Sequence, residues 1–152
     1  MATLKYWLWL TGCAGMSAPR TAKLLERFGT PENVYFADPG EYGLQSELPA
    51  GVRQALANKS LDQAEHILEQ CDRLGISVLT IQDAHYPDCL KNIPDPPAVL
   101  YYKGKLPDFD RELTIGMVGA RKCTSYGEIT AARLGLELAR AGAVIVSGIA
   151  QG

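Results

Sequence analysis

The sequence lacks the features of several common classes of protein. Its four cysteines are widely separated with no C-x-x-C pair, which argues against a zinc site and against a secreted disulfide scaffold. No apolar run approaches the roughly 20 residues needed to cross a membrane. Its two histidines have no Ser or Cys partner at catalytic spacing. We therefore expect a cytoplasmic protein with reduced thiols, no metal ion and no catalytic residues.

Two nucleotide-binding motifs are also missing. The loop that follows Val118 is not the G-x-G-x-x-G of a dinucleotide site, because its glycines, Gly119 and Gly127, are eight residues apart. It is also not the G-x-x-x-x-G-K-[ST] of a P-loop. A dehydrogenase and a P-loop ATPase are therefore disfavoured, and we expect no cofactor.

Charge is unevenly distributed along the chain, although the formal net charge is only −2. Residues 1–30 carry four Lys or Arg and one Glu, and residues 113–152 carry four Lys or Arg and two Glu. Residues 31–112 carry seven Lys or Arg and fourteen acids. A polyanion would therefore be attracted to the two ends and not to the acidic middle, unless the asymmetry is chance variation of a solvated surface.

The first half of the chain is predicted to be helical. Apolar residues recur at near-helical spacing, and Gly and Pro punctuate the pattern at short intervals. Ser17, Thr30 and Asp38 each stand where a helix N-cap is expected, and Gly75 ends the last helix. We expect residues 1–75 to form one small helical domain.

At Gly75 the pattern changes to β-branched runs, and residues 76–152 are predicted to form a second domain. Strands are expected at 76–81, 98–102, 113–119 and 143–148, and a helix at 125–141. The last two runs are almost continuously apolar, which is typical of parallel strands covered on both faces. The fold class is therefore α/β, with a strand–helix–strand unit that begins a Rossmann-like parallel sheet. Because the chain stops directly after a strand, we expect it to be the front part of a longer protein.

Two loops follow the carboxyl ends of the last two strands, where open α/β sheets bind ligands. The first contains Gly119, Arg121 and Lys122, just before the start of a helix, and the second contains Ser147 and Gly148. An Arg, a Lys and the N-terminal amides of a helix are suited to a phosphate group. A plain strand–helix connection is the alternative, but two cations at a helix N-terminus oppose the helix dipole.

A second candidate lies in the helical half. In "GMSAPRTAKLL" a glycine turn precedes a helix that carries Arg20 and Lys23 in its first turns, as in a helix–hairpin–helix that holds one nucleic-acid phosphate. Ser17 occupies the place of the second glycine of that motif. A purely structural helical hairpin is at least as consistent with these residues.

Three ordered motifs resemble the bacterial DprA/Smf family of DNA-processing proteins. They are "YPDCLKNIPDPPAVLYYKG" at 86–104, "VGARKCTSYG" at 118–127 and "IVSGIAQG" at 145–152. The helical first part resembles the sterile-alpha-motif-like (SAM-like) domain of the same family. The resemblance implies an extended Rossmann-like domain that holds single-stranded DNA in a positive pocket.

By this resemblance the DNA-binding residues are Gly119, Arg121 and Lys122 of the first loop and Ser147 and Gly148 of the second. Two residues depart from the family pattern. Ala120 replaces a common Ser and removes a hydroxyl donor, and Gln151 replaces a common Lys or Arg and removes a cation. Arg121 should therefore carry more of the binding.

The resemblance further implies a recombination mediator of natural transformation and not an enzyme. Such a protein protects incoming single strands, displaces single-strand-binding protein and loads the RecA recombinase, and it is a homodimer at full length. Because the family's contact surfaces lie mainly in later sequence, we expect this chain to bind DNA weakly. A nucleotide-binding sensor or enzyme with a Rossmann-like phosphate site is the alternative function.

Overall fold

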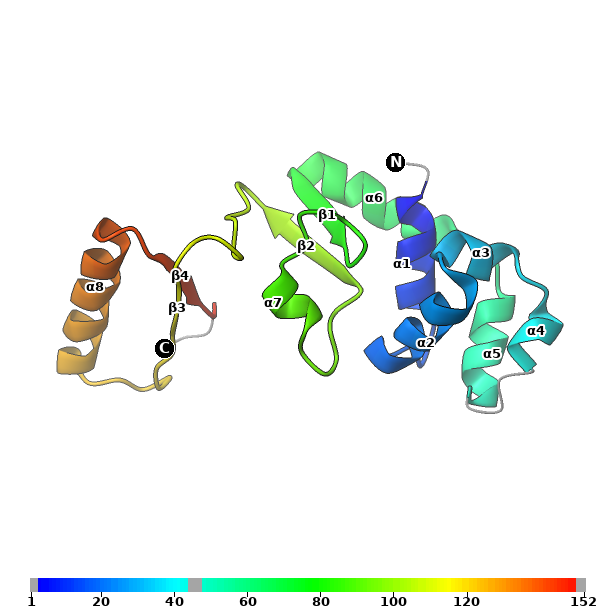
Figure 1. Cartoon of the computed structure of the whole chain (residues 1–152), viewed down its shortest axis with the longest axis horizontal. Helices are drawn as coiled ribbons and strands as arrows, with labels where there is room; N and C mark the ends of the chain where they lie inside the picture. Colours follow the sequence, from blue (N-terminus) through cyan, green and yellow to red (C-terminus); the bar gives the residue numbers. More distant parts are fainter. Residues whose placement is uncertain (1–2, 44–47, 150–152) are drawn as a thin grey trace. The chain divides into compact units, whose positions relative to one another are not determined.

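The structure, a computed structural model of the chain, describes residues 3–43 and 48–149. The chain forms two compact units, residues 1–106 and residues 107–152. Each unit is described by itself below (Figure 1). In the described ranges, no helix has the length and apolar character needed to span a membrane.

The first unit begins with six helices, as the sequence predicts. Thr30 caps α3 by accepting a hydrogen bond from the amide of Asn33, and Gly75 ends α6 in the left-handed conformation with φ of 64°. Ser17 occupies the N-cap position of α2, but its side chain makes no capping hydrogen bond. The six helices are α1 (Leu4–Gly12), α2 (Ala18–Phe28), α3 (Pro31–Phe36), α4 (Pro39–Gly43), α5 (Ala50–Ala57) and α6 (Asp62–Leu74).

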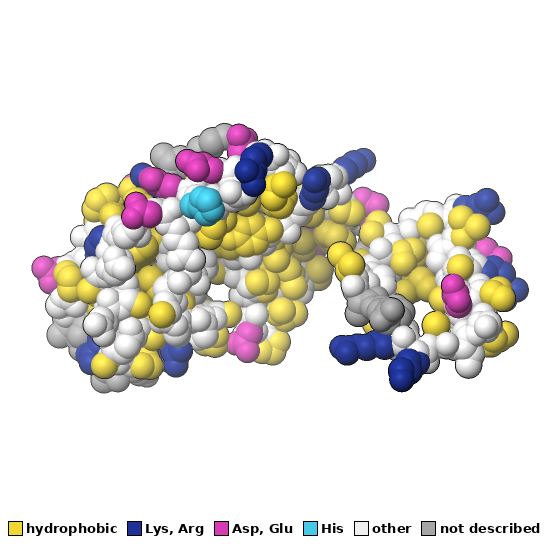
Figure 2. Space-filling view, turned by 180° about the vertical axis from the view of Figure 1, so that it is seen from behind, with side chains coloured by type: hydrophobic (Ala, Val, Ile, Leu, Met, Phe, Trp, Pro, Cys, Tyr) yellow, Lys and Arg dark blue, Asp and Glu magenta, His cyan; other side chains and the backbone are white. Residues whose placement is uncertain are grey.

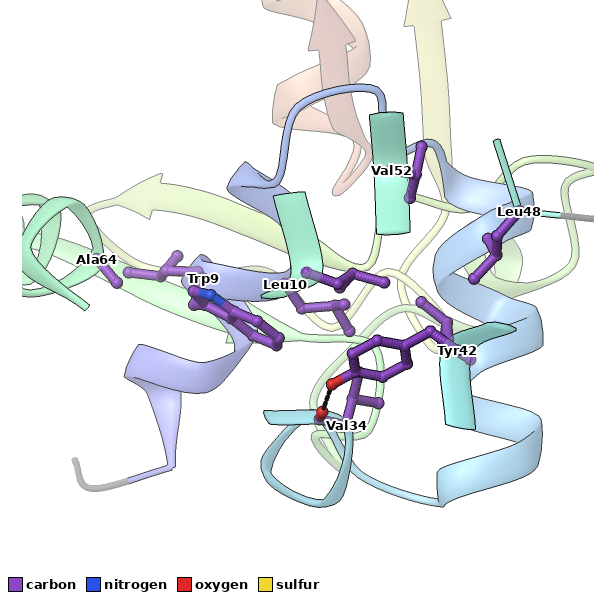
Figure 3. Packing of buried hydrophobic residues seen from close by; sticks show 10 residues of the cluster. Trp9, Leu10, Val34, Tyr42, Leu48, Val52 and Ala64 are labelled. Atoms are coloured by element: carbon purple, nitrogen blue, oxygen red, sulfur yellow. Dashed lines mark hydrogen bonds between the residues drawn. The ribbon is translucent and has the colours of Figure 1, made fainter. Parts of the chain in front are cut away.

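The helices enclose one apolar core. Helix α1 contributes three adjacent buried side chains to it and contacts both α3 and α6. In Figure 3 the Tyr42 ring lies against Leu10, and its hydroxyl points to the carbonyl of Val34, to which it donates a hydrogen bond. The buried cluster consists of Leu8, Trp9, Leu10, Leu24, Val34, Tyr42, Leu48, Val52, Leu56 and Ala64.

Strands β1 (Ile76–Thr80) and β2 (Val99–Lys103) belong to the same unit as these helices. They pair antiparallel, with Val78 opposite Tyr101, and the short helix α7 (Asp88–Lys91) lies in the connection between them. Because β1 contacts α6 and β2 contacts α1, this pair adds to the helical core. Along the chain, the boundary between the compact units therefore lies between Leu106 and Pro107, whereas the predicted domain boundary lies between residues 75 and 76. That domain boundary stays a prediction.

The second unit contains the predicted strand–helix–strand element. Strands β3 (Thr114–Met117) and β4 (Val144–Ser147) pair in parallel, and α8 (Ser125–Arg140) connects them. A Cβ added at Gly135 of α8 would lie 3.5 Å from Sδ of Met117, which shows that the helix packs closely on β3. The mixed α/β fold predicted from the sequence is confirmed, with the parallel pairing confined to β3 and β4.

The prediction that these strands are covered on both faces is wrong for the described residues. Val146 of β4 is 44% exposed, and no residue of α8 is buried. The apolar stripe predicted on α8 is likewise open, with Ile129 69% and Leu136 52% exposed. Two strands and one helix offer too little surface to enclose the apolar faces of all three.

A partly buried lysine, Lys59, contacts three aromatic rings of the helical unit. The ammonium of Lys59, in the segment between α5 and α6, lies 4.9 Å from the ring centre of Trp9, 5.3 Å from that of Tyr35 and 5.0 Å from that of Tyr42. It also donates a hydrogen bond of 2.6 Å to the Tyr42 hydroxyl. Burial lowers the pKa of Lys59. Within the described residues, the ammonium contacts the three ring faces, the Tyr42 hydroxyl and the carbonyl oxygen of Val34.

We expect Lys59→Met to lower the free energy of unfolding by about 1–2 kcal/mol, the loss of a charge-assisted hydrogen bond and of cation–π attraction. Urea unfolding followed by tryptophan fluorescence measures the change. Lys105→Met, at an exposed lysine of the same unit, is the matched control and should change stability by less than about 0.5 kcal/mol. Equal losses in the two variants would contradict a stabilising role for the contacts between Lys59 and the three rings.

Raising the pH should weaken the same unit. Burial raises the pKa of the Cys13 thiol from 9.0 to about 11 and that of Tyr42 from 10.0 to about 12. Both groups ionise more easily in the unfolded chain, so their contribution is complete below about pH 9 and is lost as the pH rises through 11 and 12. The lowered pKa of Lys59 acts in the opposite direction.

The unfolding midpoint in urea should therefore fall between pH 8.5 and pH 11, a range set by these shifts. Cys13→Ala should show a shallower fall than the unaltered chain. Cys123→Ala, which removes an exposed thiol, should leave the slope unchanged. An equally steep fall in Cys13→Ala would show that the buried thiol is not responsible.

Candidate nucleic-acid interface

The parallel pairing of β3 and β4 brings the two predicted loops to one edge of the sheet. Met117, the last residue of β3, is the register partner of Ser147, the last residue of β4. Because parallel strands point the same way, the segments that begin at Val118 and Gly148 both leave from this edge. The structure thus places all five predicted site residues, Gly119, Arg121, Lys122, Ser147 and Gly148, in these two segments or at the end of β4.

Arg121 and Lys122 are available to a ligand. Both side chains are exposed, and neither has an ion pair or a hydrogen bond within the described part of the chain. Figure 2 shows basic side chains projecting from the lower edge of the second unit, at the right of the view. A cation with no internal partner keeps its full capacity for an external anion.

The N-terminus of α8 follows these cations directly. Its N-cap is Thr124, whose hydroxyl accepts a hydrogen bond of 3.2 Å from the amide of Gly127. The amides of Ser125 and Tyr126 remain without a backbone partner in the described chain. The helix therefore offers two amide donors and the positive end of its dipole beside Arg121 and Lys122.

Thr124 caps α8 and is not among the residues that the sequence predicts for the site. A threonine directly before the first helical residue is itself an N-cap signal, so the pattern could have identified Thr124. Its hydroxyl holds the helix N-terminus and so fixes the direction in which the free amides point.

Gly119 and Gly148 leave the sheet edge uncovered. A Cβ added at either position would meet no atom within 4 Å, and neither glycine has a positive φ. The fold itself therefore does not require glycine at these positions. Their lack of a side chain instead leaves the backbone open to a ligand, which is the role predicted for them.

The site is an open surface in the described chain. All residues from Val118 to Tyr126 are exposed, and so are Ser147 and Gly148. The Ser147 hydroxyl makes one long contact of 3.4 Å, to the carbonyl oxygen of Gly148. Gln151, one of the two departures from the family pattern, lies outside the described residues.

Within residues 3–43 and 48–149, no group of three His, Cys, Asp or Glu side chains could hold a metal ion. His66 and His85 lie in separate surface segments and take part in no hydrogen bond that involves a described residue. The arrangement at the edge of β3 and β4 can bind an anion by charge and by backbone amides.

The chain is similar to a known family of proteins. The family model described as "DNA recombination-mediator protein A" matches residues 77–152, the second half of the chain. "DNA processing protein DprA" of Bacillus subtilis (strain 168) is 45% identical over 78 residues, which are 51% of this chain and 26% of the relative.

Two further relatives are named "Protein Smf". That of Synechocystis sp. is 30% identical over 155 residues, which cover 97% of this chain and 38% of the relative. That of Borreliella burgdorferi is 38% identical over 80 residues, which cover 53% of this chain and 25% of the relative. The chain thus spans between a quarter and two fifths of the length of these relatives.

The residues matched by the family model contain β3, α8, β4 and both loops of the candidate interface. The match to the Synechocystis relative extends over the helical unit as well. The chain therefore belongs to the DNA recombination-mediator protein A family, the DprA/Smf proteins.

Proposed function

We propose that the protein binds single-stranded DNA through the surface at the carboxyl edge of β3 and β4. It acts as a recombination mediator of natural transformation that protects incoming strands and loads RecA onto them. The observation that carries the proposal is the exposed, unpartnered pair Arg121 and Lys122 beside the free amides of α8. Family membership supplies DNA as the source of the phosphates.

The chemistry of the surface favours the DNA backbone over the bases. Its donors are a guanidinium, an ammonium, two amides and the hydroxyl of Ser147, all of which suit phosphate oxygens. The part of the surface described here has no aromatic ring except that of Tyr126, which is 79% exposed at the start of α8. We therefore infer contact with the backbone without sequence preference.

The remaining parts of the proposal follow from the family. We infer a cytoplasmic protein that is not an enzyme, needs no cofactor, competes with single-strand-binding protein and acts as a homodimer at full length. The DNA-binding residues are Gly119, Arg121, Lys122, Ser147 and Gly148, and residues 76–152 form the first part of the Rossmann-like domain that holds them.

Arg121→Ala should weaken binding of the chain to single strands about fivefold on every sequence, because a phosphate contact carries no base information. The measurement is fluorescence anisotropy with labelled 30-mers of dT and of mixed sequence at low ionic strength. The slope of log affinity against log salt should become less steep by about one. Arg140→Ala, at the far end of α8, removes the same charge and should leave affinity within twofold.

The same titration separates the proposal from a nucleotide sensor or enzyme. Binding of a mononucleotide that persists at high salt, or its turnover, would favour the nucleotide site over DNA. A loss in Arg121→Ala that depends on the base sequence would show direct readout of bases, which contradicts backbone binding.

A further inference from the structure

Strand β1 of the first unit has an open outer edge. In the described chain its sheet contains only β1 and β2, so β1 is paired on one side and not on the other. The amide of Ile81, directly after β1, donates a hydrogen bond of 3.0 Å to the carbonyl oxygen of Ala98. In an antiparallel pair, residues that bond to the partner strand alternate with residues that do not. Every second residue before Ile81 therefore bonds to β2, and the residues between them turn their backbone groups outward.

The residues of β1 that face the open edge are Ile76, Val78 and Thr80. The amide of Thr80 is already used, because it donates a hydrogen bond of 2.6 Å to a carboxylate oxygen of Asp83. The amides and carbonyl groups of Ile76 and Val78 have no such partner among the described residues. Strand β1 also contains no charged residue and no proline, which commonly protect a sheet edge from other chains. Its edge can therefore accept a further strand.

A groove runs along this open edge. Its larger part has a volume of about 670 Å³ and lies where β1 and α6 contact each other (Figure 1). A smaller part, of about 410 Å³, shares Leu4 and Val78 with the larger one and extends along β1 to Thr80. Both volumes lie within the range of binding sites. The groove thus follows the strand over most of its length.

The floor of the groove is apolar. Leu68 and Val78 pack against the core of the unit but are only partly buried. Leu4 and Ile76, which also line the larger part, are likewise partly buried. Apolar side chains that are still open to water favour a bound chain that covers them with an apolar side chain of its own.

One wall of the groove is acidic. Helix α6 carries four acids at spacings of three, four and three residues, so they lie along one side of the helix. They are Asp62, Glu65, Glu69 and Asp72. Lys5 pairs with Glu65 at 3.7 Å, whereas Glu69 and Asp72, which line the groove, are exposed and make no side-chain hydrogen bond or ion pair within the described residues. Figure 2 shows acidic side chains along the upper surface of the first unit, the side on which Figure 1 places α6.

These three features together define the chemistry of an occupant. An open strand edge binds an extended peptide through main-chain hydrogen bonds, and neighbouring pockets select its side chains. The two carboxylates attract Lys or Arg and repel the phosphates of a nucleic acid. A basic, extended protein segment is therefore the ligand that fits the edge, the floor and the wall.

We propose that this groove binds an extended, basic segment of a partner protein. The segment adds to β1 as a third strand through the amides and carbonyl groups of Ile76 and Val78. It places an apolar side chain over Leu68 and a Lys or Arg beside Glu69 and Asp72. The groove belongs to the first unit, so it does not depend on the DNA-binding surface proposed for the second.

A short synthetic peptide of alternating lysine and valine is the probe for strand addition. In NMR spectra of the 152-residue chain, the amide signals of Ile76 and Val78 should shift when this peptide is added. The same peptide with every backbone amide N-methylated keeps its charge and side chains but cannot donate to the strand edge. It should bind at least tenfold more weakly by fluorescence anisotropy. Equal binding of the two peptides, or no shift at Ile76 and Val78, would overturn strand addition.

A double variant, Glu69→Gln with Asp72→Asn, tests the acidic wall with almost no change of shape. It should weaken binding of the lysine–valine peptide about fivefold at low ionic strength and remove most of its salt dependence. Glu26→Gln with Asp95→Asn makes the same change of charge at exposed acids of the same unit that do not line the groove, and affinity should stay within twofold. Equal losses in the two double variants would contradict the assignment of the groove.

Other occupants give different results. A glutamate–valine peptide of the same length should not bind, and equal binding would contradict charge complementarity. Self-association of the chain in sedimentation experiments that is lost in Glu69→Gln with Asp72→Asn would identify a second copy and overturn a partner protein. Shifts at Ile76 and Val78 on addition of oligo(dT) would overturn a protein ligand. Arg121→Ala should leave peptide binding unchanged, so failure of the groove and failure of the DNA-binding proposal are distinguishable.

Discussion

Parallel pairing of β3 with β4 is the constraint on which the candidate interface depends. The register that sets Met117 beside Ser147 makes both following segments leave from one edge of the sheet. The right-handed connection expected of such a unit needs a helix between the strands, and α8 supplies it. Since the helix must begin near the edge at which β3 ends, its N-terminal amides face the same region as Arg121 and Lys122. Charge and dipole therefore meet there as a result of topology.

The distribution of ion pairs explains why these cations can serve an external partner. In the acidic middle of the chain, cations have carboxylates nearby, as in the pairs of Lys91 with Asp88 at 3.2 Å and Arg111 with Asp108 at 3.7 Å. Such exposed pairs add little stability, but they occupy the cation. Arg121 and Lys122 follow an apolar strand and precede a helix whose nearest acid is Glu128, so the local sequence provides no carboxylate to compete with a phosphate.

The first unit forms its apolar core from short helices. Helices of four to thirteen residues are marginal by themselves and depend on tertiary contacts. Lys59 provides such contacts between separate segments, because its ammonium is shared by rings from α1, α3 and α4. Strands β1 and β2 extend the same core.

Local patterns in the sequence were sufficient to predict the six helices of the first 75 residues, α8 and the four strands, but not the short helix α7. The residues of the candidate interface stay a prediction. Helix caps such as Thr30 and Gly75, and the apolar runs before Gly119 and Gly148, act through neighbouring residues and can therefore be read without a structure. Only the tertiary structure showed that β1 and β2 pair antiparallel with each other and pack against the helices of the first unit. It alone showed that the Lys59 ammonium lies against the rings of Trp9, Tyr35 and Tyr42. Both arrangements depend on contacts between residues far apart in the chain, which periodicity and spacing do not encode.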